Sequence, residues 1–127
     1  MSVLRTPEER FTGLPDYSFP PNYLYVETAG VPPVRMHYVD AGPTDGPVVV
    51  LLHGQPTWSF MYRKVIGALA DSGLRVIAPD NIGFGRSDKP AEATDYTFGR
   101  HIDWVHGLIA GLDLREVTLV VQDWGGP

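Results

Sequence analysis

The sequence contains no cysteine. This absence excludes a disulfide framework, a thiolate nucleophile and any cysteine-based metal site. It is typical of a reducing compartment, and we therefore expect a cytoplasmic protein. The first ten residues lack an apolar core of the length that a secretory signal peptide needs, which agrees with that expectation.

Long hydrophobic runs and an excess of basic charge are also missing. The longest apolar run, Val48 to Leu52, is far too short to cross a bilayer. The 10 Lys and Arg residues are scattered among 15 Asp and Glu residues, which gives a formal net charge of -5. Proteins that bind nucleic acids usually carry a basic patch that neutralises phosphates. We therefore expect neither a membrane nor a nucleic acid as a partner.

The composition is that of an ordinary globular protein. The 127 residues are 43% hydrophobic and 20% charged, which fits one small domain. Residues 1–21 are rich in Pro, Glu and Arg and show little periodicity, so they are interpreted as an N-terminal arm on the surface. Residues 22–127 contain periodic segments separated by turns and are predicted to form a core domain.

Two short strands are expected at the start of this core domain. They cover residues 23–28 and 34–40, and residues 29–33 between them form a turn, so the pair predicts an antiparallel hairpin. In the second strand, apolar and polar residues alternate. His37 in this strand is interpreted as an ordinary surface or packing residue.

After the hairpin, the order of elements is strand, helix, strand, helix, strand. They are expected at residues 48–52, 59–72, 75–78, 97–111 and 117–121. Ser59 and Thr97 are expected to cap the two helices, and Gly73 stands where a C-terminal glycine belongs. The apolar face of the first helix is expected to consist of Met61, Val65, Ala68 and Leu69. This alternation predicts parallel strands joined by right-handed crossovers. The fold class is therefore α/β, with an antiparallel hairpin that leads into a mostly parallel sheet with helices on its faces.

Three loops leave the carboxyl ends of the parallel strands, where ligands bind in such sheets. The loop after Ala78 contains a Gly-x-Gly pair, but the sequence has neither Gly-Lys-Ser/Thr nor Gly-x-Gly-x-x-Gly, which argues against a nucleotide site. The loop after Leu52 begins with His53, which we interpret as a hydrogen-bonded structural residue rather than a general base. No cluster of His, Asp and Glu has the spacing of metal ligands, so we expect no metal.

The third loop follows Val121 and reads Gln-Asp-Trp-Gly-Gly. A polar residue followed by small residues at a strand end is typical of a nucleophile elbow, in which the glycines permit a tight turn and a close helix. The polar residue here is Asp123, and an ionised carboxylate can displace a leaving group from carbon without a base. On this run alone, Asp123 fits a helix N-cap equally well.

Together, three motifs resemble those of the haloalkane dehalogenases, a family in the α/β-hydrolase superfamily. The motifs are His53 to Ser59, Asp80 to Pro90, and Gln122 to Gly126, in the family's order and at its separations. The resemblance implies that Asp123 is the catalytic nucleophile and forms an ester with the alkyl group of a small halogenated aliphatic substrate. Water then hydrolyses the ester to give an alcohol and halide.

The resemblance also implies roles for two further residues. The backbone N–H groups of Gln55 and Trp124 would form the oxyanion hole. The indole N–H of Trp124 would bind the departing halide, and Gln55 is a second candidate for halide binding. No metal or organic cofactor is implied, and we expect a monomer.

The same resemblance implies that the sequence covers only the N-terminal part of such an enzyme. The family's catalytic acid, its histidine and its helical cap would follow residue 127. We therefore expect the chain by itself to be an inactive fragment. Two alternatives stay open: an epoxide hydrolase, which shares the Asp nucleophile, and a non-catalytic truncated remnant.

Overall fold

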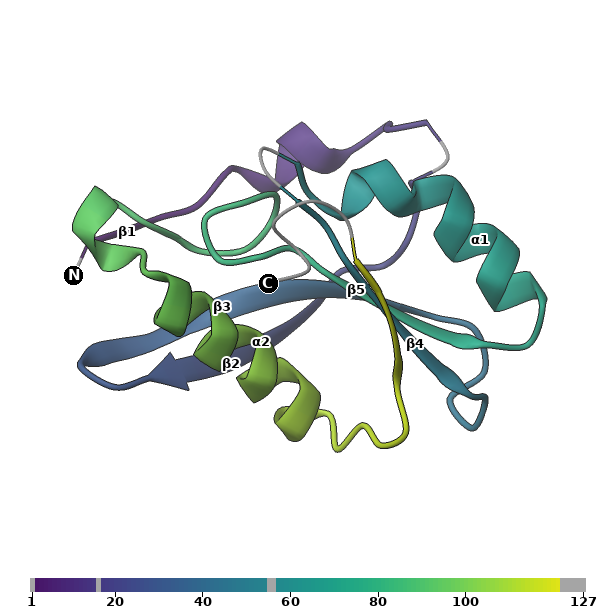
Figure 1. Ribbon diagram of the computed structural model, residues 1–127. Helices are drawn as coiled ribbons and strands as arrows, with labels where there is room; N and C mark the ends of the chain where they lie inside the picture. The colour runs from purple at the N-terminus through teal and green to yellow at the C-terminus, as the bar shows by residue number, and fades with distance from the viewer. Residues whose placement is uncertain (1, 16, 55–56, 122–127) are drawn as a thin grey trace.

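A five-stranded sheet with the strand order β2-β3-β5-β4-β7 forms the centre of the structure (Figure 1). The structure is a computed structural model that describes residues 2–15, 17–54 and 57–121. The strands are β2 (Asn22–Thr28), β3 (Val31–Ala41), β4 (Val48–Leu52), β5 (Arg75–Pro79) and β7 (Thr118–Val121). Strand β3 is antiparallel to β2 and β5, whereas β4 is parallel to β5 and β7. The predicted hairpin followed by parallel strands is confirmed, and the sheet is mixed.

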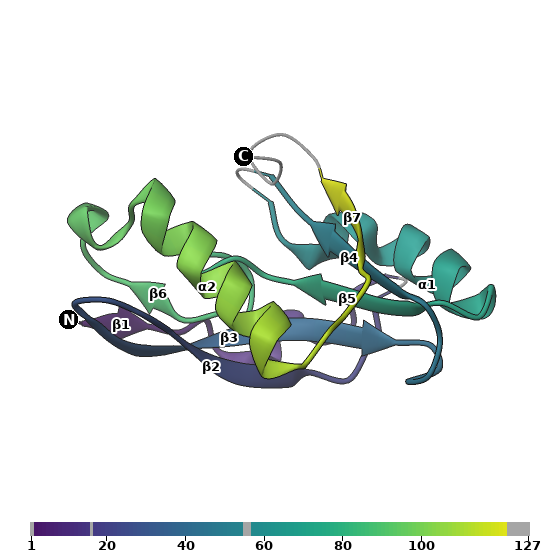
Figure 2. The same ribbon diagram turned by 60° about the horizontal axis from the view of Figure 1, so that its bottom comes forward.

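Two helices cover opposite faces of this sheet (Figure 2). They are α1 (Arg63–Asp71) and α2 (Phe98–Gly111). Because successive strand residues point to opposite faces, β4 contributes to two separate cores. Leu51 packs in a cluster with Ile66 of α1, and Val50 packs in a cluster with Trp104 of α2. The continuous apolar run of β4 is thus explained by burial on both sides.

The ends of the helices follow local chemistry at two of the three predicted positions. Thr97 caps α2, since its Oγ1 accepts a hydrogen bond from the Arg100 N–H at 3.1 Å. Gly73 follows α1 with a φ of 92°, the left-handed conformation in which glycine is favoured. Both predictions are confirmed.

The predicted start of the first helix is wrong, and its predicted apolar face is right only at Leu69. Ser59 begins a short 3-10 helix, η2 (Ser59–Tyr62), and makes no capping hydrogen bond. Ser59, Tyr62 and Ile66 are buried, and Leu69 packs against the same cluster. Met61 and Val65 are 37% and 43% exposed, and Ala68 is exposed as well. This stretch carries two adjacent apolar stripes, and contact with the sheet selects the one that contains Ile66.

The predicted turn at residues 29–33 is shorter than expected, because β3 already begins at Val31. The strand therefore includes two prolines, which cannot donate to a ladder. They lie opposite Glu27, where the register shifts between the pairs Val26–Val34 and Thr28–Val31. Such a bulge interrupts the ladder and tolerates proline.

The N-terminal arm packs against the loop that follows β5. Strand β1 (Val3–Leu4) pairs with β6 (Lys89–Pro90), and Arg5 forms an ion pair with Asp88. Two further short 3-10 helices are η1 (Glu8–Phe11) and η3 (Ala93–Asp95). Phe11 and Tyr17 of the arm are buried. The arm thus contributes side chains to the core.

Strand β7 lies at the end of the sheet order, and its residues are exposed on both faces. Leu119, Val120 and Val121 are 52%, 38% and 46% exposed.

Among the described residues, no helix combines the length and the apolar character that a membrane span requires.

Candidate active site

Strands β4 and β7 end at the same edge of the sheet. The two strands are parallel, and Leu52 at the end of β4 pairs with Val121 at the end of β7. Strand β5 is parallel to β4 on its other side and ends at Pro79. The three sequence-predicted site residues, Gln55, Asp123 and Trp124, lie outside the described residues, and their roles stay predictions. The structure describes the residues that flank and support them.

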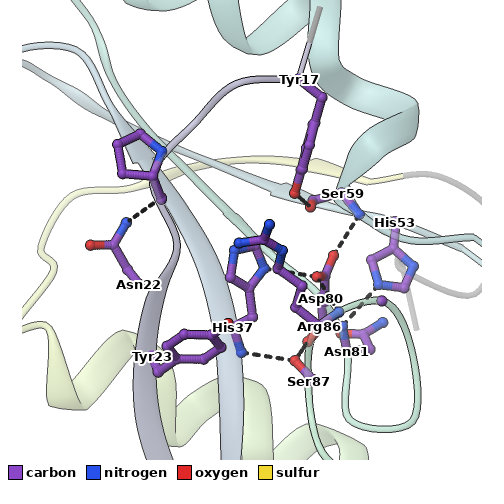
Figure 3. A network of polar contacts seen from close by, with 12 residues as sticks. Tyr17, Asn22, Tyr23, His37, His53, Ser59, Asp80, Asn81, Arg86 and Ser87 are labelled. Carbon is purple, nitrogen blue, oxygen red and sulfur yellow. Dashed lines mark hydrogen bonds and ion pairs between the residues drawn. The ribbon is translucent and has the colours of Figure 1, made fainter. Parts of the chain in front are cut away.

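A buried carboxylate, that of Asp80, is the centre of a polar network at this edge (Figure 3). Its Oδ1 accepts the backbone N–H of Ser59 at 2.7 Å. Its Oδ2 lies 2.8 Å from Nδ1 of His37 and accepts the backbone N–H of Arg86 at 3.0 Å. The hydroxyl of Ser87 donates to the carbonyl of Asp80. One residue at the end of β5 therefore joins β3, the start of η2 and its own loop.

The environment of Asp80 favours its ionised form. Burial by itself would raise the pKa of this carboxyl. Hydrogen bonds from the His37 ring and from two backbone N–H groups oppose that effect and hold the pKa below its ordinary value. Because a buried charge is costly without partners, these contacts are what make the carboxylate stable there.

His37 was missed as a buried network residue by the sequence analysis. The alternating pattern of the second strand suggests one buried and one polar face, but Met36, His37 and Tyr38 are all buried. The reason is that the loop after β5 covers the second face, and the Ser87 hydroxyl accepts the His37 N–H at 2.8 Å. The sequence around His37 alternates between apolar and polar residues and gave no signal that this position is buried.

His53 is a structural residue, as predicted. Its side chain is 1% exposed, and both ring nitrogens are engaged. Nε2 accepts the backbone N–H of Asn81 at 2.8 Å, so Nδ1 carries the proton and donates to the carbonyl of Gly54 at 2.8 Å. Burial is the main cause that lowers the pKa of His53, which keeps the ring neutral. A ring with neither nitrogen free cannot act as a general base.

An aromatic cluster packs around Trp58, in the loop that follows β4. The Trp58 ring stacks on Phe60, with the ring centroids 5.5 Å apart, and meets the edges of Phe11 and Tyr17. The Tyr17 hydroxyl also lies 2.6 Å from the Ser59 hydroxyl. The N-terminal arm therefore packs directly on the loop that carries Gln55.

The Gly-x-Gly pair shapes the loop around Asp80 and takes up positive φ angles. Gly83 and Gly85 have φ values of 99° and 53°. A Cβ on Gly85 would lie 2.5 Å from Oδ2 of Asp80 and 2.9 Å from the Cβ of Trp58. The glycine is required because the backbone passes so close to the buried carboxylate.

We expect Gly85→Ala to lower the free energy of unfolding by about 3 kcal/mol, because it adds both backbone strain and a clash with a hydrogen-bonded charge. Gly13→Ala is the matched control: Gly13 has a φ of 69° but no heavy atom within 4 Å of the added Cβ. It should cost only about 1 kcal/mol. Urea denaturation measures both values, and equal losses would contradict the role assigned to the clash.

The described residues at this edge form a buried, hydrogen-bonded polar network around Asp80. No group of three or more His, Asp or Glu among the described residues could hold a metal ion. His37 and Asp80 are buried and face each other. The chemistry that this edge can support therefore depends on the side chains that the adjoining loops present.

Comparison with known proteins defines the class. Residues 47–127 match the family described as alpha/beta hydrolase fold. The chain belongs to this family, which agrees with the mixed sheet and its covering helices.

Within this class, the chain is similar to haloalkane dehalogenases. It is 58% identical over 125 residues to the haloalkane dehalogenase of Mycolicibacterium paratuberculosis, covering 98% of this chain and 42% of that protein. It is 54% identical over 126 residues to the one of Psychrobacter cryohalolentis, covering 99% of this chain and 42% of that protein. The chain thus spans about two fifths of the length of the curated relatives it matches, namely 42%.

Solved structures of haloalkane dehalogenases and of epoxide hydrolases are also similar to this chain. The haloalkane dehalogenase DpaA of Paraglaciecola agarilytica, described as tetrameric, has a TM-score of 0.91 and 49% identity, with coverage of 99% of this chain and 42% of that chain. The epoxide hydrolase VrEH1 of Vigna radiata has a TM-score of 0.70 and 35% identity, with coverage of 83% of this chain and 32% of that chain.

Proposed function

We propose that the protein that carries this chain is a haloalkane dehalogenase, which converts a small halogenated aliphatic compound and water into an alcohol, a halide ion and a proton. The observation that carries the proposal is the 58% identity to a haloalkane dehalogenase over 98% of this chain. This similarity extends across all three motifs of the proposed site.

The first step is a displacement by Asp123. One carboxylate oxygen attacks the carbon that bears the halogen, and the C–O bond forms as the carbon–halogen bond breaks. The halide leaves with the bonding electron pair, and an alkyl ester of Asp123 remains. The indole N–H of Trp124 stabilises the halide, with the side chain of Gln55 as a second candidate donor.

The second step is hydrolysis of this ester. A water oxygen attacks the carboxyl carbon of Asp123, and one proton of the water passes to a histidine base that the resemblance places after residue 127. The backbone N–H groups of Gln55 and Trp124 stabilise the oxyanion that forms. The intermediate then expels the alkoxide, which takes the proton from the histidine to become the alcohol. The carboxyl of Asp123 releases the second proton of the water to solvent, and the carboxylate is restored.

Two features of the structure support these assignments. The strands that precede Gln55 and Asp123 in the sequence, β4 and β7, are parallel and end at one edge of the sheet, where Leu52 pairs with Val121. The Asp80 and His53 contacts hold the first of these loops without using a residue that the reaction requires.

An epoxide hydrolase is the alternative enzyme, since it shares the Asp nucleophile. The 58% identity to a curated haloalkane dehalogenase, compared with 35% to the Vigna radiata enzyme, favours the dehalogenase. The test is to incubate the complete gene product with 1-bromobutane and, separately, with 1,2-epoxybutane. We expect bromide and 1-butanol from the first. A diol from the second without bromide from the first would support the epoxide hydrolase, and neither product would support a non-catalytic remnant.

We propose the substrate class, a small halogenated aliphatic compound, together with the reaction. The expectation of a monomer stays a prediction, and the tetrameric description of one solved relative argues against treating it as general. Light scattering on the complete gene product measures its oligomeric state. The cytoplasmic location also stays a prediction.

A further inference from the structure

A groove lies on the surface between the N-terminal arm and the first turns of α1. Its volume is about 420 Å³, which is within the range of small-molecule sites. The arm and α1 pack into the same core cluster on one face of the sheet. The groove, which we call the α1 groove, is lined by Ser18, Phe19, Arg63, Lys64 and Gly67.

The α1 groove carries two positive charges that have no acidic partner. Arg63 and Lys64 are adjacent, and neither forms an ion pair with a carboxylate of the described residues. The first turn of α1 contains no acidic residue. The N-terminal end of a helix is the positive end of its dipole, so two cations there are unfavourable for the helix itself. An anion bound between them would offset that repulsion.

The Arg63 guanidinium is held in place by Phe60. Its Cζ lies 4.1 Å from the centroid of the Phe60 ring, and its Nη1 donates to the Phe60 carbonyl at 3.2 Å. This bond uses only one of the N–H groups of the guanidinium. The positive charge is therefore positioned at the groove before any ligand binds, and further donors remain for it.

Gly67 keeps the floor of the groove open. It lies in the interior of α1, where glycine is less stable than alanine. Its φ is outside the left-handed region, and a Cβ built on it would have no heavy atom within 4 Å. Neither the backbone conformation nor the packing therefore requires glycine here. A larger side chain would occupy part of the space that this residue lines.

The arm supplies an apolar wall and a free hydroxyl. The ring of Phe19 meets the edge of the Tyr17 ring, with the centroids 5.5 Å apart, and packs against the core cluster that contains Ile66. These contacts limit its movement. The hydroxyl of Ser18 makes no hydrogen bond to another described residue and is available to a ligand.

We propose that the α1 groove binds a small organic phosphate monoester. The phosphate group lies between Arg63 and Lys64, and the organic part lies against Phe19. A phosphate monoester carries a charge of about −1.5 to −2 at neutral pH, which matches two adjacent cations. The groove lies outside the three loops of the proposed active site, so this inference does not rest on the proposed function.

The test is an NMR titration of the ¹⁵N-labelled complete gene product with phenyl phosphate. We expect the amide signals of Lys64 and Gly67 to shift, with a Kd on the order of 1 mM for a ligand of this size. Phenol, which lacks the phosphate group, should shift neither signal at the same concentrations. Inorganic phosphate, which lacks the ring, should bind more weakly than phenyl phosphate.

Two variants test the charge and the space separately. Lys64→Gln should weaken binding of phenyl phosphate by about fivefold, the upper effect of one solvent-exposed ion pair. Arg115→Gln is its control, since it removes a cation that is 82% exposed elsewhere. Gly67→Leu should abolish binding, because the side chain fills the groove. Gly99→Leu is its control, since a Cβ on that glycine of α2 also has no heavy atom within 4 Å. Both controls should bind as the unsubstituted protein does.

The proposal is overturned if phenyl phosphate leaves the Lys64 and Gly67 signals unchanged. It is also overturned if Lys64→Gln and Arg115→Gln weaken binding alike, since the effect then reflects net charge. Equal affinity for inorganic phosphate and phenyl phosphate would remove Phe19 from the site. Leucine is favoured over glycine within a helix, so Gly67→Leu should melt no lower than the unsubstituted protein. The exposed Lys64 side chain provides the test that does not depend on this substitution.

Discussion

Asp123→Asn should lower the rate of bromide release from 1-bromobutane by about 10⁴-fold, because removal of a catalytic nucleophile costs at least that much. The neutral amide is a poor nucleophile toward carbon, whereas the carboxylate needs no base to attack. The change is nearly isosteric, so the fold should be kept. Initial rates of bromide release in the complete gene product measure the effect.

Asp113→Asn is the matched control for this substitution. The Asp113 side chain is 81% exposed, and its φ of 52° suits asparagine as well as aspartate. Its rate should equal that of the unsubstituted protein. An Asp123→Asn variant that keeps its rate within about tenfold would remove Asp123 from the role of nucleophile.

Trp124→Phe should slow cleavage of the carbon–halogen bond by about 10²–10³-fold, the usual effect of removing one preorganised donor from a developing charge. Phenylalanine keeps an aromatic ring and lacks the indole N–H. The loss should appear in the first turnover, since the halide departs in that step. Rapid-quench measurement of the first bromide equivalent gives the rate.

Trp104→Phe is the control, because it removes an indole N–H from a core residue of α2. Trp104 is buried, and its Nε1 has no hydrogen-bond partner among the residues that the structure describes. The substitution should lower stability through lost packing and leave the first-turnover rate unchanged. If both variants slow bromide release alike, the Trp124 effect reflects packing and not halide binding.

Local chemistry explains why much of the fold could be predicted. The β-branched run of β4, the capping hydroxyl of Thr97 and the positive φ of Gly73 act through near neighbours in the chain. The parallel order of β5, β4 and β7 follows from alternating strands and helices. The structural role of His53 was also predictable, because it follows a strand that is buried on both faces.

The features that were missed depend on contacts between distant segments. Ser59 has the residue type of an N-cap, but its hydroxyl meets Tyr17 and its N–H meets Asp80. His37 follows an alternating pattern, but the loop after β5 buries the face that the pattern leaves polar. Neither partner can be read from the residues next to it in the sequence.

The candidate site, like the fold, could be predicted from the sequence only in part. Motif order pointed to the loops after β4, β5 and β7, but the dense packing of the second of these loops around Asp80 required the structure. The sequence argued against a nucleotide site at the glycines of that loop and assigned them no other role. Their function became clear only from the distance between Gly85 and the buried carboxylate.

The central claim is that Asp123 forms an ester with the alkyl group and that water attacks its carboxyl carbon. A single turnover in H₂¹⁸O, with enzyme in excess over 1-bromobutane, tests this claim directly by mass spectrometry of the peptide that contains Asp123 and of the butanol. We predict ¹⁸O in the Asp123 carboxylate and unlabelled butanol, because the alcohol oxygen comes from the aspartate. Labelled butanol together with an unlabelled Asp123 would show direct attack of water on the substrate and would contradict the account.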